Sequence, residues 1–398
     1  MNGINKKDLK RQNRLLVLRL LCETPDISRT VLTQKTGLVK MTVSNIINDM
    51  LAVGSVCERE KLTQENTPRS GRRQTSLGFS DKAPLIMGIS LARDVCKGIV
   101  VDMQLHETAS DSFLLEQTET AQSLTEKMLA LISRLQEKSA FRVDAIGIST
   151  IGPLDAAHGV ILNPPNFYGI HDYPITEILS STTHLPCILQ NDMNAAALAE
   201  KCFGTYSACE NFIYVGLTNG IGSGIILNDQ LYCGGDGFAG EIGHFVIDYQ
   251  GLPCHCGNRG CLETYASVPV VLQRFRDMFH RPFADVSELC TFCRESAQAD
   301  RMLREVCELL SIGLANLCNC LDPKLLILGH EGADIADTYV QEIERQLNQR
   351  IFAQRVKQIP IVHSSFGRNA PVYGGAVSVL SEIFSGRLFY DRLFGADE

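Results

Sequence analysis

One short segment of the sequence constrains the fold more than any other. Residues 241–263 bring together one imidazole and three thiols, those of His244, Cys254, Cys256 and Cys261. Gly257 and Gly260 allow the backbone between the thiols to turn, so that the last cysteine returns to the same metal. One nitrogen and three sulfur ligands suit tetrahedral zinc. The alternative, three buried thiols in a chain with 15 cysteines, fits poorly with two glycines and a histidine at this spacing. The sequence therefore predicts a structural zinc knuckle.

The segment also resembles the signature of the ROK family (repressor, open reading frame, kinase). The resemblance rests on residues 240–244 (GEIGH) and on the pattern Cys-x-Cys-Gly-x-x-Gly-Cys-Leu-Glu. Three upstream segments resemble the sugar-binding segments of the family in the same order, namely residues 152–155, 163–166 and 190–200. Together these motifs cover most of the chain from about residue 81 onward and point to the NagC/XylR-like repressor branch.

Strands and helices alternate through this part of the chain, which predicts an α/β fold with sheets covered by helices. Short apolar strands are expected at residues 84–90, 98–102, 145–148, 211–217, 224–227 and 324–329, and helices at 123–139, 268–280 and 301–321. The resemblance implies a two-lobed, actin-like and ribonuclease-H-like ATPase fold with its ligand between the lobes. We expect lobe one at about 81–195 plus a C-terminal helix at about 372–398, and lobe two at about 196–371.

The first 80 residues differ from the rest in charge. They hold 14 basic and 7 acidic residues, a net charge of +7, whereas the remainder holds 23 and 38, a net charge of −15. The first 80 residues therefore form a basic head and the remainder an acidic body. Because the phosphate backbone of nucleic acid attracts the basic head and repels the acidic body, we expect residues 1–80 alone to contact nucleic acid. A solvated charged face is the alternative.

Helical periodicity in this head predicts a helix-turn-helix. A helix around 13–21 is followed by helices starting at Ser28 and at Lys40, and the last carries one apolar stripe. Its opposite face presents polar or cationic side chains that can reach base edges or phosphates, those of Lys40, Thr42, Ser44, Asn45 and Asn48. A small helical packing domain is the alternative.

A two-stranded wing is expected to follow, with strands at residues 56–59 and 74–79. The loop between them concentrates the three guanidinium groups of Arg69, Arg72 and Arg73, which suit phosphate contact or a narrow minor groove. Exposed linker charge is the alternative. We thus expect residues 1–80 to form a winged helix-turn-helix DNA-binding domain and residues 81–398 to form the ROK sugar-binding domain.

The ROK resemblance implies which residues bind a sugar. Vicinal hydroxyls need paired donors and acceptors, and the family motifs supply them here as Asn166, Asn191, Asp192, Glu241, His244 and Glu263. His244 has two possible roles, because one ring nitrogen can bind zinc while the other faces the sugar.

The parts that handle phosphate in ROK kinases are altered. The family's Asp-x-Gly-Gly-Thr turn is replaced by a run in which Ser90, Ala92 and Arg93 stand for the acid and the glycines. Asn219 replaces a threonine in the second phosphate loop, and residues 329–332 (GHEG) depart from a paired-glycine contact to adenosine. We therefore expect a sugar-responsive DNA-binding transcriptional regulator, a repressor, of genes for carbohydrate uptake or catabolism, and no enzyme. An ATP-dependent sugar kinase with an added head is the alternative; a zinc-stabilised DNA-binding protein without a ligand is a third possibility.

The expected partners follow from this hypothesis. A helix-turn-helix protein of this kind reads pseudo-palindromic operator DNA as a homodimer, here a dimer or tetramer, and its effector is a small carbohydrate or sugar phosphate. We expect a cytoplasmic location without a membrane partner, because no apolar run reaches the length of a membrane span and the N-terminus lacks the apolar core of a secretory signal. The remaining cysteines are expected to be free thiols.

Overall fold

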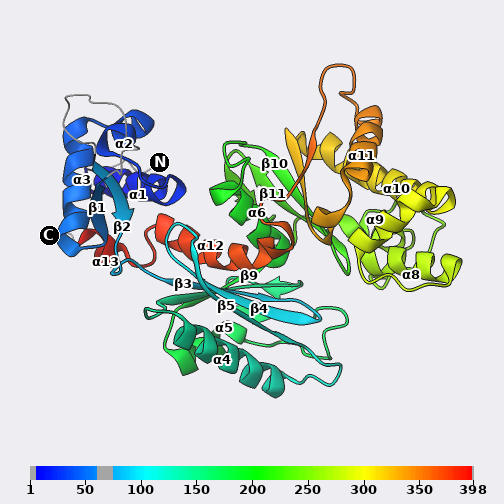
Figure 1. Ribbon diagram of the computed structural model, residues 1–398, viewed down its shortest axis with the longest axis horizontal. Helices are drawn as coiled ribbons and strands as arrows, with labels where there is room; N and C mark the ends of the chain where they lie inside the picture. The colour runs from blue at the N-terminus through cyan, green and yellow to red at the C-terminus, as the bar shows by residue number, and fades with distance from the viewer. Residues whose placement is uncertain (1–5, 61–74, 397–398) are drawn as a thin grey trace. The chain divides into compact units, whose positions relative to one another are not determined.

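The computed structural model describes residues 6–60 and 75–396, and its chain forms two compact units (Figure 1). Unit 1 consists of Met1–Ile148, Asn166–Leu189 and Gly375–Glu398, and unit 2 of Ser149–Pro165 and Gln190–Gly374. The chain thus passes between the units several times. The lobe limits expected from the sequence remain predictions.

Unit 1 begins with three helices and a two-stranded antiparallel sheet: α1 (Lys6–Glu23), α2 (Arg29–Thr36), α3 (Lys40–Val53), β1 (Val56–Glu60) and β2 (Thr75–Phe79). Ser28 caps α2 by accepting a hydrogen bond from the Val31 N–H, and Gly37 ends the helix in the left-handed conformation. The apolar stripe of α3 is buried as predicted, through Val43, Ile46, Ile47 and Met50.

A short C-terminal helix, α13 (Tyr390–Phe394), packs against α3 in the same unit. The Leu393 carbonyl accepts a hydrogen bond of 2.8 Å from the Ser55 hydroxyl, and both residues are fully buried. Arg14 of α1 donates to the Tyr390 hydroxyl at 3.2 Å. The N-terminal helices therefore share their core with the last residues of the chain.

The rest of unit 1 is built on a sheet of five strands in the order β5-β4-β3-β6-β9, some of whose strands continue into unit 2. These strands are β3 (Ile86–Leu91), β4 (Val95–Val101), β5 (Glu107–Leu114), β6 (Ala145–Thr150) and β9 (Cys187–Asn191). Helix α4 (Ala121–Lys138) packs on β4 and β5, and α5 (Ile175–Thr183) packs on α4.

Unit 2 repeats this arrangement with a second five-stranded sheet, ordered β12-β11-β10-β13-β14. Its strands are β10 (Phe212–Leu217), β11 (Ile221–Leu227), β12 (Gln230–Tyr232), β13 (Leu325–His330) and β14 (Ile361–His363). The first three are antiparallel neighbours, while β13 pairs parallel with β10 and β14. In both sheets the first strand lies in the centre, between a hairpin and the fourth strand, so the two sheets have the same strand order. The predicted α/β fold is confirmed.

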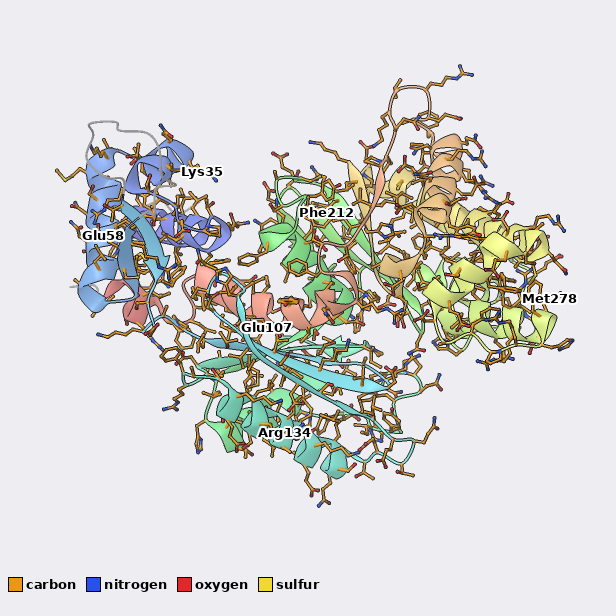
Figure 2. The ribbon with its side chains drawn as sticks, viewed as in Figure 1. Lys35, Glu58, Glu107, Arg134, Phe212 and Met278 are labelled. Carbon is orange, nitrogen blue, oxygen red and sulfur yellow. The ribbon has the colours of Figure 1, made fainter. Side chains whose placement is uncertain are left out.

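Strand β10 divides the core of unit 2 between its two faces. Phe212, labelled in Figure 2, and Tyr214 point to α6 (Asp192–Phe203), whereas Ile213 and Val215 point to a larger core. This alternation buries both faces of the sheet. The larger core is covered by helices that include α10 (Ala297–Leu321) and α11 (Asp337–Arg350).

The remaining elements include several short ones and one longer, largely buried helix near the C-terminus. They are β7 (Leu154–Asp155), β8 (Val160–Ile161), α7 (Glu263–Ala266), α8 (Val268–Phe279), α9 (Val286–Glu295), α12 (Ala370–Phe384) and the 3₁₀ helices η1 (Ile242–His244), η2 (Glu331–Asp334) and η3 (Gly367–Asn369). No helix within residues 6–60 and 75–396 is both long and apolar enough to cross a membrane.

Candidate functional site

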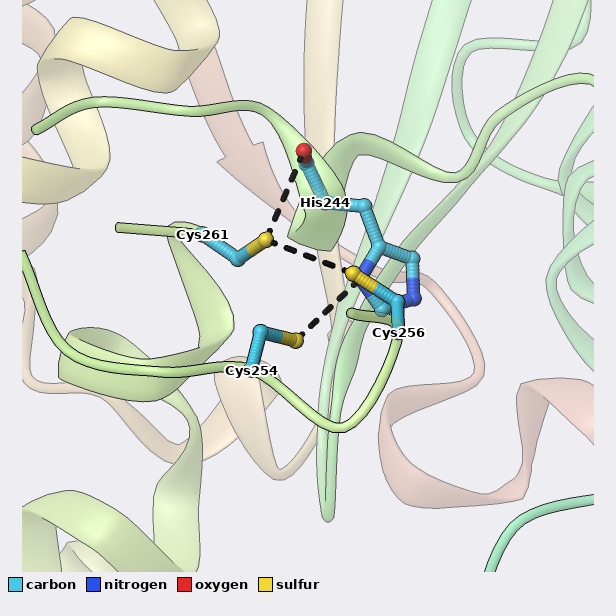
Figure 3. A group of neighbouring side chains, drawn as sticks. All are labelled: His244, Cys254, Cys256 and Cys261. Atoms are coloured by element: carbon cyan, nitrogen blue, oxygen red, sulfur yellow. Dashed lines mark hydrogen bonds between the residues drawn. The ribbon is translucent and has the colours of Figure 1, made fainter. Parts of the chain in front are cut away.

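The four residues predicted to bind zinc come together in unit 2. His244 ends η1, and the three cysteines lie on the loop before α7, with all four ligand atoms within 4.8 Å of one another (Figure 3). The Cys256 and Cys261 sulfur atoms are 3.7 Å apart, and Cys254 Sγ is 3.7 Å from His244 Nδ1. The spacing in the sequence thus becomes a compact cluster in space.

The loop is folded by its own backbone hydrogen bonds. The Cys254 N–H donates to the Asn258 carbonyl at 2.9 Å, and the Ile247 N–H donates to the Gly260 carbonyl at 2.8 Å. Gly260 has φ +70°, and a Cβ there would lie 1.6 Å from the Asp248 carbonyl oxygen. Only glycine fits this approach, which returns Cys261 to the cluster.

These distances fit a tetrahedral zinc ion. Zn–S bonds of about 2.3 Å at tetrahedral angles separate two sulfur atoms by about 3.8 Å, close to the 3.7 Å between Cys256 and Cys261. All three thiols are free rather than joined as a disulfide. Burial raises the pKa of the Cys254 thiol, whereas the Asn258 N–H lowers that of Cys256. The donor set is that of a structural zinc site.

Two further side chains adjoin the cluster. Glu263, at the start of α7, places Oε1 3.2 Å from Cys254 Sγ, 3.5 Å from His244 Nδ1 and 3.3 Å from His255 Nδ1. The predicted sugar ligand Glu263 therefore also touches the predicted metal ligands. Sequence reasoning missed His255, although its position between Cys254 and Cys256 is a visible signal.

The motif at residues 190–200 forms the start of α6. Asn191 Oδ1 caps this helix by accepting from the Met193 and Asn194 N–H groups. Within the described part of the chain, its amide nitrogen makes no hydrogen bond. Asp192 is 9% exposed; its Oδ1 accepts from the Met193 N–H. Its other oxygen, Oδ2, lies 3.7 Å from His330 Nε2.

The last two predicted sugar ligands differ in position. Glu241 precedes η1 and is exposed, yet desolvation by surrounding protein atoms raises the pKa of its carboxylate, and the charges of Asp192 and Glu263 act in the same direction. Asn166 belongs to unit 1, where it is exposed with φ +56°. The other five predicted sugar ligands belong to unit 2, namely Asn191, Asp192, Glu241, His244 and Glu263.

The turn after β3 differs from a glycine-rich phosphate turn. Ala92 and Arg93 carry side chains, and neither has a positive φ. The Ala92 N–H donates to the Val95 carbonyl at 3.0 Å, and the Arg93 carbonyl accepts from the Tyr168 hydroxyl. Backbone groups of the turn are therefore engaged within the protein.

The polar face predicted on α3 lies at the surface. Lys40, Asn45 and Asn48 are exposed, while Thr42 and Ser44 are half-buried. Asn48 Oδ1 accepts from Arg29 at 3.0 Å, and Arg29 also pairs with Glu58 at 2.9 Å. Of the two exposed asparagines on α3, Asn45 and Asn48, only Asn48 makes a side-chain hydrogen bond within the described residues.

Sequence reasoning missed two apolar side chains beside Lys40. Val39 and Met41 are 75% and 70% exposed, which is unusual for such residues. The sequence did offer a signal for them, because both apolar residues flank Lys40 and interrupt the predicted polar face. The wing arginines Arg69, Arg72 and Arg73 lie outside the described residues.

Comparisons with known proteins agree with this architecture. The chain is 30% identical to a xylose repressor of Caldicellulosiruptor bescii, over 95% of this chain and 97% of that protein. Its fold is similar to that of a ROK family transcriptional regulator, a homologue of the E. coli MLC protein, with a TM-score of 0.79, 22% identity and coverage of 97% of this chain and 99% of that one. A ROK hexokinase from Thermus thermophilus matches with a TM-score of 0.65 and 29% identity, over 76% of this chain and 100% of the hexokinase.

The family model named ROK matches residues 86–382. This range holds both five-stranded sheets, the histidine and cysteine cluster and every predicted sugar ligand. The chain belongs to the ROK family.

Proposed function

We propose that the protein is a sugar-responsive transcriptional repressor. Its N-terminal head would bind operator DNA, and its body would bind a small carbohydrate that weakens this binding. The observation that carries the proposal is how much of this chain each similar protein covers. The repressor and the regulator match nearly the whole chain, whereas the complete hexokinase leaves about a quarter of it unmatched. That quarter corresponds in size to the N-terminal head.

The head has the parts of a winged helix-turn-helix. Helices α2 and α3 are joined by a short turn at Gly37, and β1 and β2 form an antiparallel pair that would be the wing. We propose that α3 enters the major groove, with Lys40, Thr42, Ser44, Asn45 and Asn48 contacting DNA. Exposed Val39 and Met41 suit contact with thymine methyl groups. Arg69, Arg72 and Arg73 of the wing would contact phosphates or the minor groove.

The body would bind its effector through Asn166, Asn191, Asp192, Glu241, His244 and Glu263. Because His244 Nδ1 faces the thiols, Nε2 is the nitrogen left for a sugar. We propose that zinc is bound by His244, Cys254, Cys256 and Cys261 as a structural ion. It would hold the loop that carries Glu263 in place beside η1.

Kinase activity is the alternative function, and three features argue against it. The turn at Ala92 and Arg93 carries side chains and uses its backbone groups internally. Ser90 replaces the metal-binding acid, and His330 interrupts the paired-glycine contact to adenosine. Phosphoryl transfer depends on backbone N–H groups and metal ions around the phosphates.

Release of DNA would follow from a population shift. A sugar weakens DNA binding only if it prefers a body conformation that places the two heads of a homodimer or tetramer at the wrong half-site spacing. D-xylose is the first effector to test because of the likeness to a xylose repressor.

Binding of selected DNA tests the proposal. Sequences enriched from a random pool by the full chain without sugar are titrated by fluorescence anisotropy with and without D-xylose, D-glucose, N-acetylglucosamine and their phosphates. At least one sugar should weaken binding, and Asp192→Ala should remove that response while DNA affinity stays unchanged. Failure to enrich any DNA, or turnover of ATP with a sugar, would refute the proposal.

A further inference from the structure

His330 is a polar residue in an uncommon backbone conformation at the end of β13. Its φ of +54° and ψ of −135° suit glycine far better than a side chain with a Cβ. The imidazole is nearly buried, with its side chain 11% exposed. Such strain persists where surrounding contacts fix it, and it often marks a functional position.

Tyr214 fixes the orientation and tautomer of this imidazole. The buried Tyr214 hydroxyl accepts a hydrogen bond from the His330 backbone N–H and lies 3.1 Å from His330 Nδ1. Burial raises the pKa of Tyr214 well above its usual range, so the phenol keeps its proton. The phenol can donate this proton to Nδ1, which is then an acceptor, and in that tautomer the imidazole proton is on Nε2.

The surrounding glycines leave the space that this pair occupies. A Cβ on Gly329 would lie 1.8 Å from the Tyr214 hydroxyl, and a Cβ on Gly216 would lie 2.8 Å from His330 Nδ1. Residues 216 and 329 are register partners on β10 and β13. The absence of Cβ atoms at these two register partners thus leaves room on the sheet for the Tyr214 and His330 side chains.

His330 Nε2 is consequently a positioned donor without a protein acceptor. Within the described residues it is buried and has no hydrogen-bond partner. Asp192 Oδ2 lies 3.7 Å away, beyond the usual limit of about 3.2 Å. An oxygen atom about 2.9 Å from both would complete their hydrogen bonding, and a hydroxyl group satisfies both at once because it donates and accepts.

The charges that unit 2 places around Asp192 favour an uncharged ligand. Asp192, Glu241 and Glu263 place three carboxylates among the predicted sugar ligands of unit 2. A phosphate group would bring further negative charge to them, whereas a hydroxyl does not.

We propose that His330 is an effector-binding residue, and that its Nε2–H and the Asp192 carboxylate together bind one hydroxyl group of an uncharged monosaccharide. The hydroxyl donates to Asp192 and accepts from His330. This inference rests on the proposed sugar-responsive function and adds to it a specificity-determining residue and the chemical class of the ligand.

Calorimetric titration of the full chain with D-xylose, D-glucose, N-acetylglucosamine, their monodeoxy analogues and glucose 6-phosphate tests it. His330→Gly suits the backbone conformation and should not lower the melting temperature, and it should weaken binding of the best sugar about tenfold or more. The matched control is His280→Gly, an exposed histidine with φ +49° at the end of α8, which should leave binding unchanged. One monodeoxy analogue should bind wild type weakly and show no further loss with His330→Gly.

The outcomes separate the two ideas. Tight sugar binding by wild type and His330→Gly alike would overturn the role of His330 and leave the proposed function standing. Binding of glucose 6-phosphate in preference to every uncharged sugar would overturn the ligand class. No binding of any of these compounds to wild type would overturn the proposed function, and this inference with it.

Discussion

The contact between the C-terminal helix and the N-terminal head allows a quantitative prediction. Leu393 of α13 is fully buried, and its carbonyl holds the buried Ser55 hydroxyl that follows α3. Replacing a buried leucine by alanine costs about 2–5 kcal/mol, depending on how far the cavity collapses. We therefore expect Leu393→Ala to destabilise the N-terminal helices, more than 330 residues away in sequence.

Hydrogen exchange measures this effect where it occurs, since unfolding of a chain with two units does not define one free energy. A loss of 2 kcal/mol corresponds to exchange about thirtyfold faster at amides of α3 such as those of Ile47 and Met50. Leu9→Ala is the matched control, because Leu9 lies on α1 and is 51% exposed; its effect should stay within about 0.5 kcal/mol.

The result that refutes the reasoning is specific. If Leu393→Ala speeds exchange in α13 but leaves α3 as protected as in wild type, then α13 packs against the N-terminal helices without stabilising them. Equal acceleration by Leu9→Ala would mean that the head is sensitive to any substitution and that the buried contact has no special role.

Three further predictions concern metal, catalysis and DNA. Cys256→Ser should abolish stoichiometric zinc in elemental analysis and weaken the sugar response, whereas Cys320→Ser, at an exposed free cysteine, should change neither; zinc-free wild type with a full response would contradict this. Coupled assays should detect no ADP release with any sugar, and turnover near ~1 s⁻¹ would instead favour a kinase. Asn45→Ala should cost about 1–3 kcal/mol on selected DNA and little on random DNA. Replacing Arg72 and Arg73 by alanine should weaken binding to both DNAs and reduce the log–log salt slope by up to about two units; the opposite pattern would reverse the roles of helix and wing.

The features predicted correctly from sequence are those with local signals. The apolar stripe of α3 repeats at helical spacing, and Ser28 and Gly37 mark the ends of α2. The histidine and cysteine cluster follows from spacing within one loop. In each case the residues that decide the structure are close together in the sequence.

The missed features lack such signals. Strand β5 alternates exposed and half-buried residues at a sheet edge and contains few apolar side chains, while β14 has only three residues. Val39 and Met41 are the exception: they gave a local signal by interrupting a polar face, but their exposure goes against the usual preference of apolar residues. The proximity of His330 to Asp192 depends on β13 pairing with β10 and on α6 packing beside β10, contacts between distant segments.

The position of His330 also bears on how a kinase-like fold can serve a repressor. Its backbone conformation suits glycine. Compared with the paired glycines of the ROK kinases, the backbone turn is therefore kept and the side chain is what differs. By the ROK resemblance, the kinases have paired glycines at this place, where the bare backbone contacts adenosine. Here the imidazole occupies that place, is held by Tyr214 and directs a donor toward Asp192. Under the proposed function, the side chain that departs from the adenosine contact thus also adds a polar group beside Asp192, one of the predicted sugar ligands.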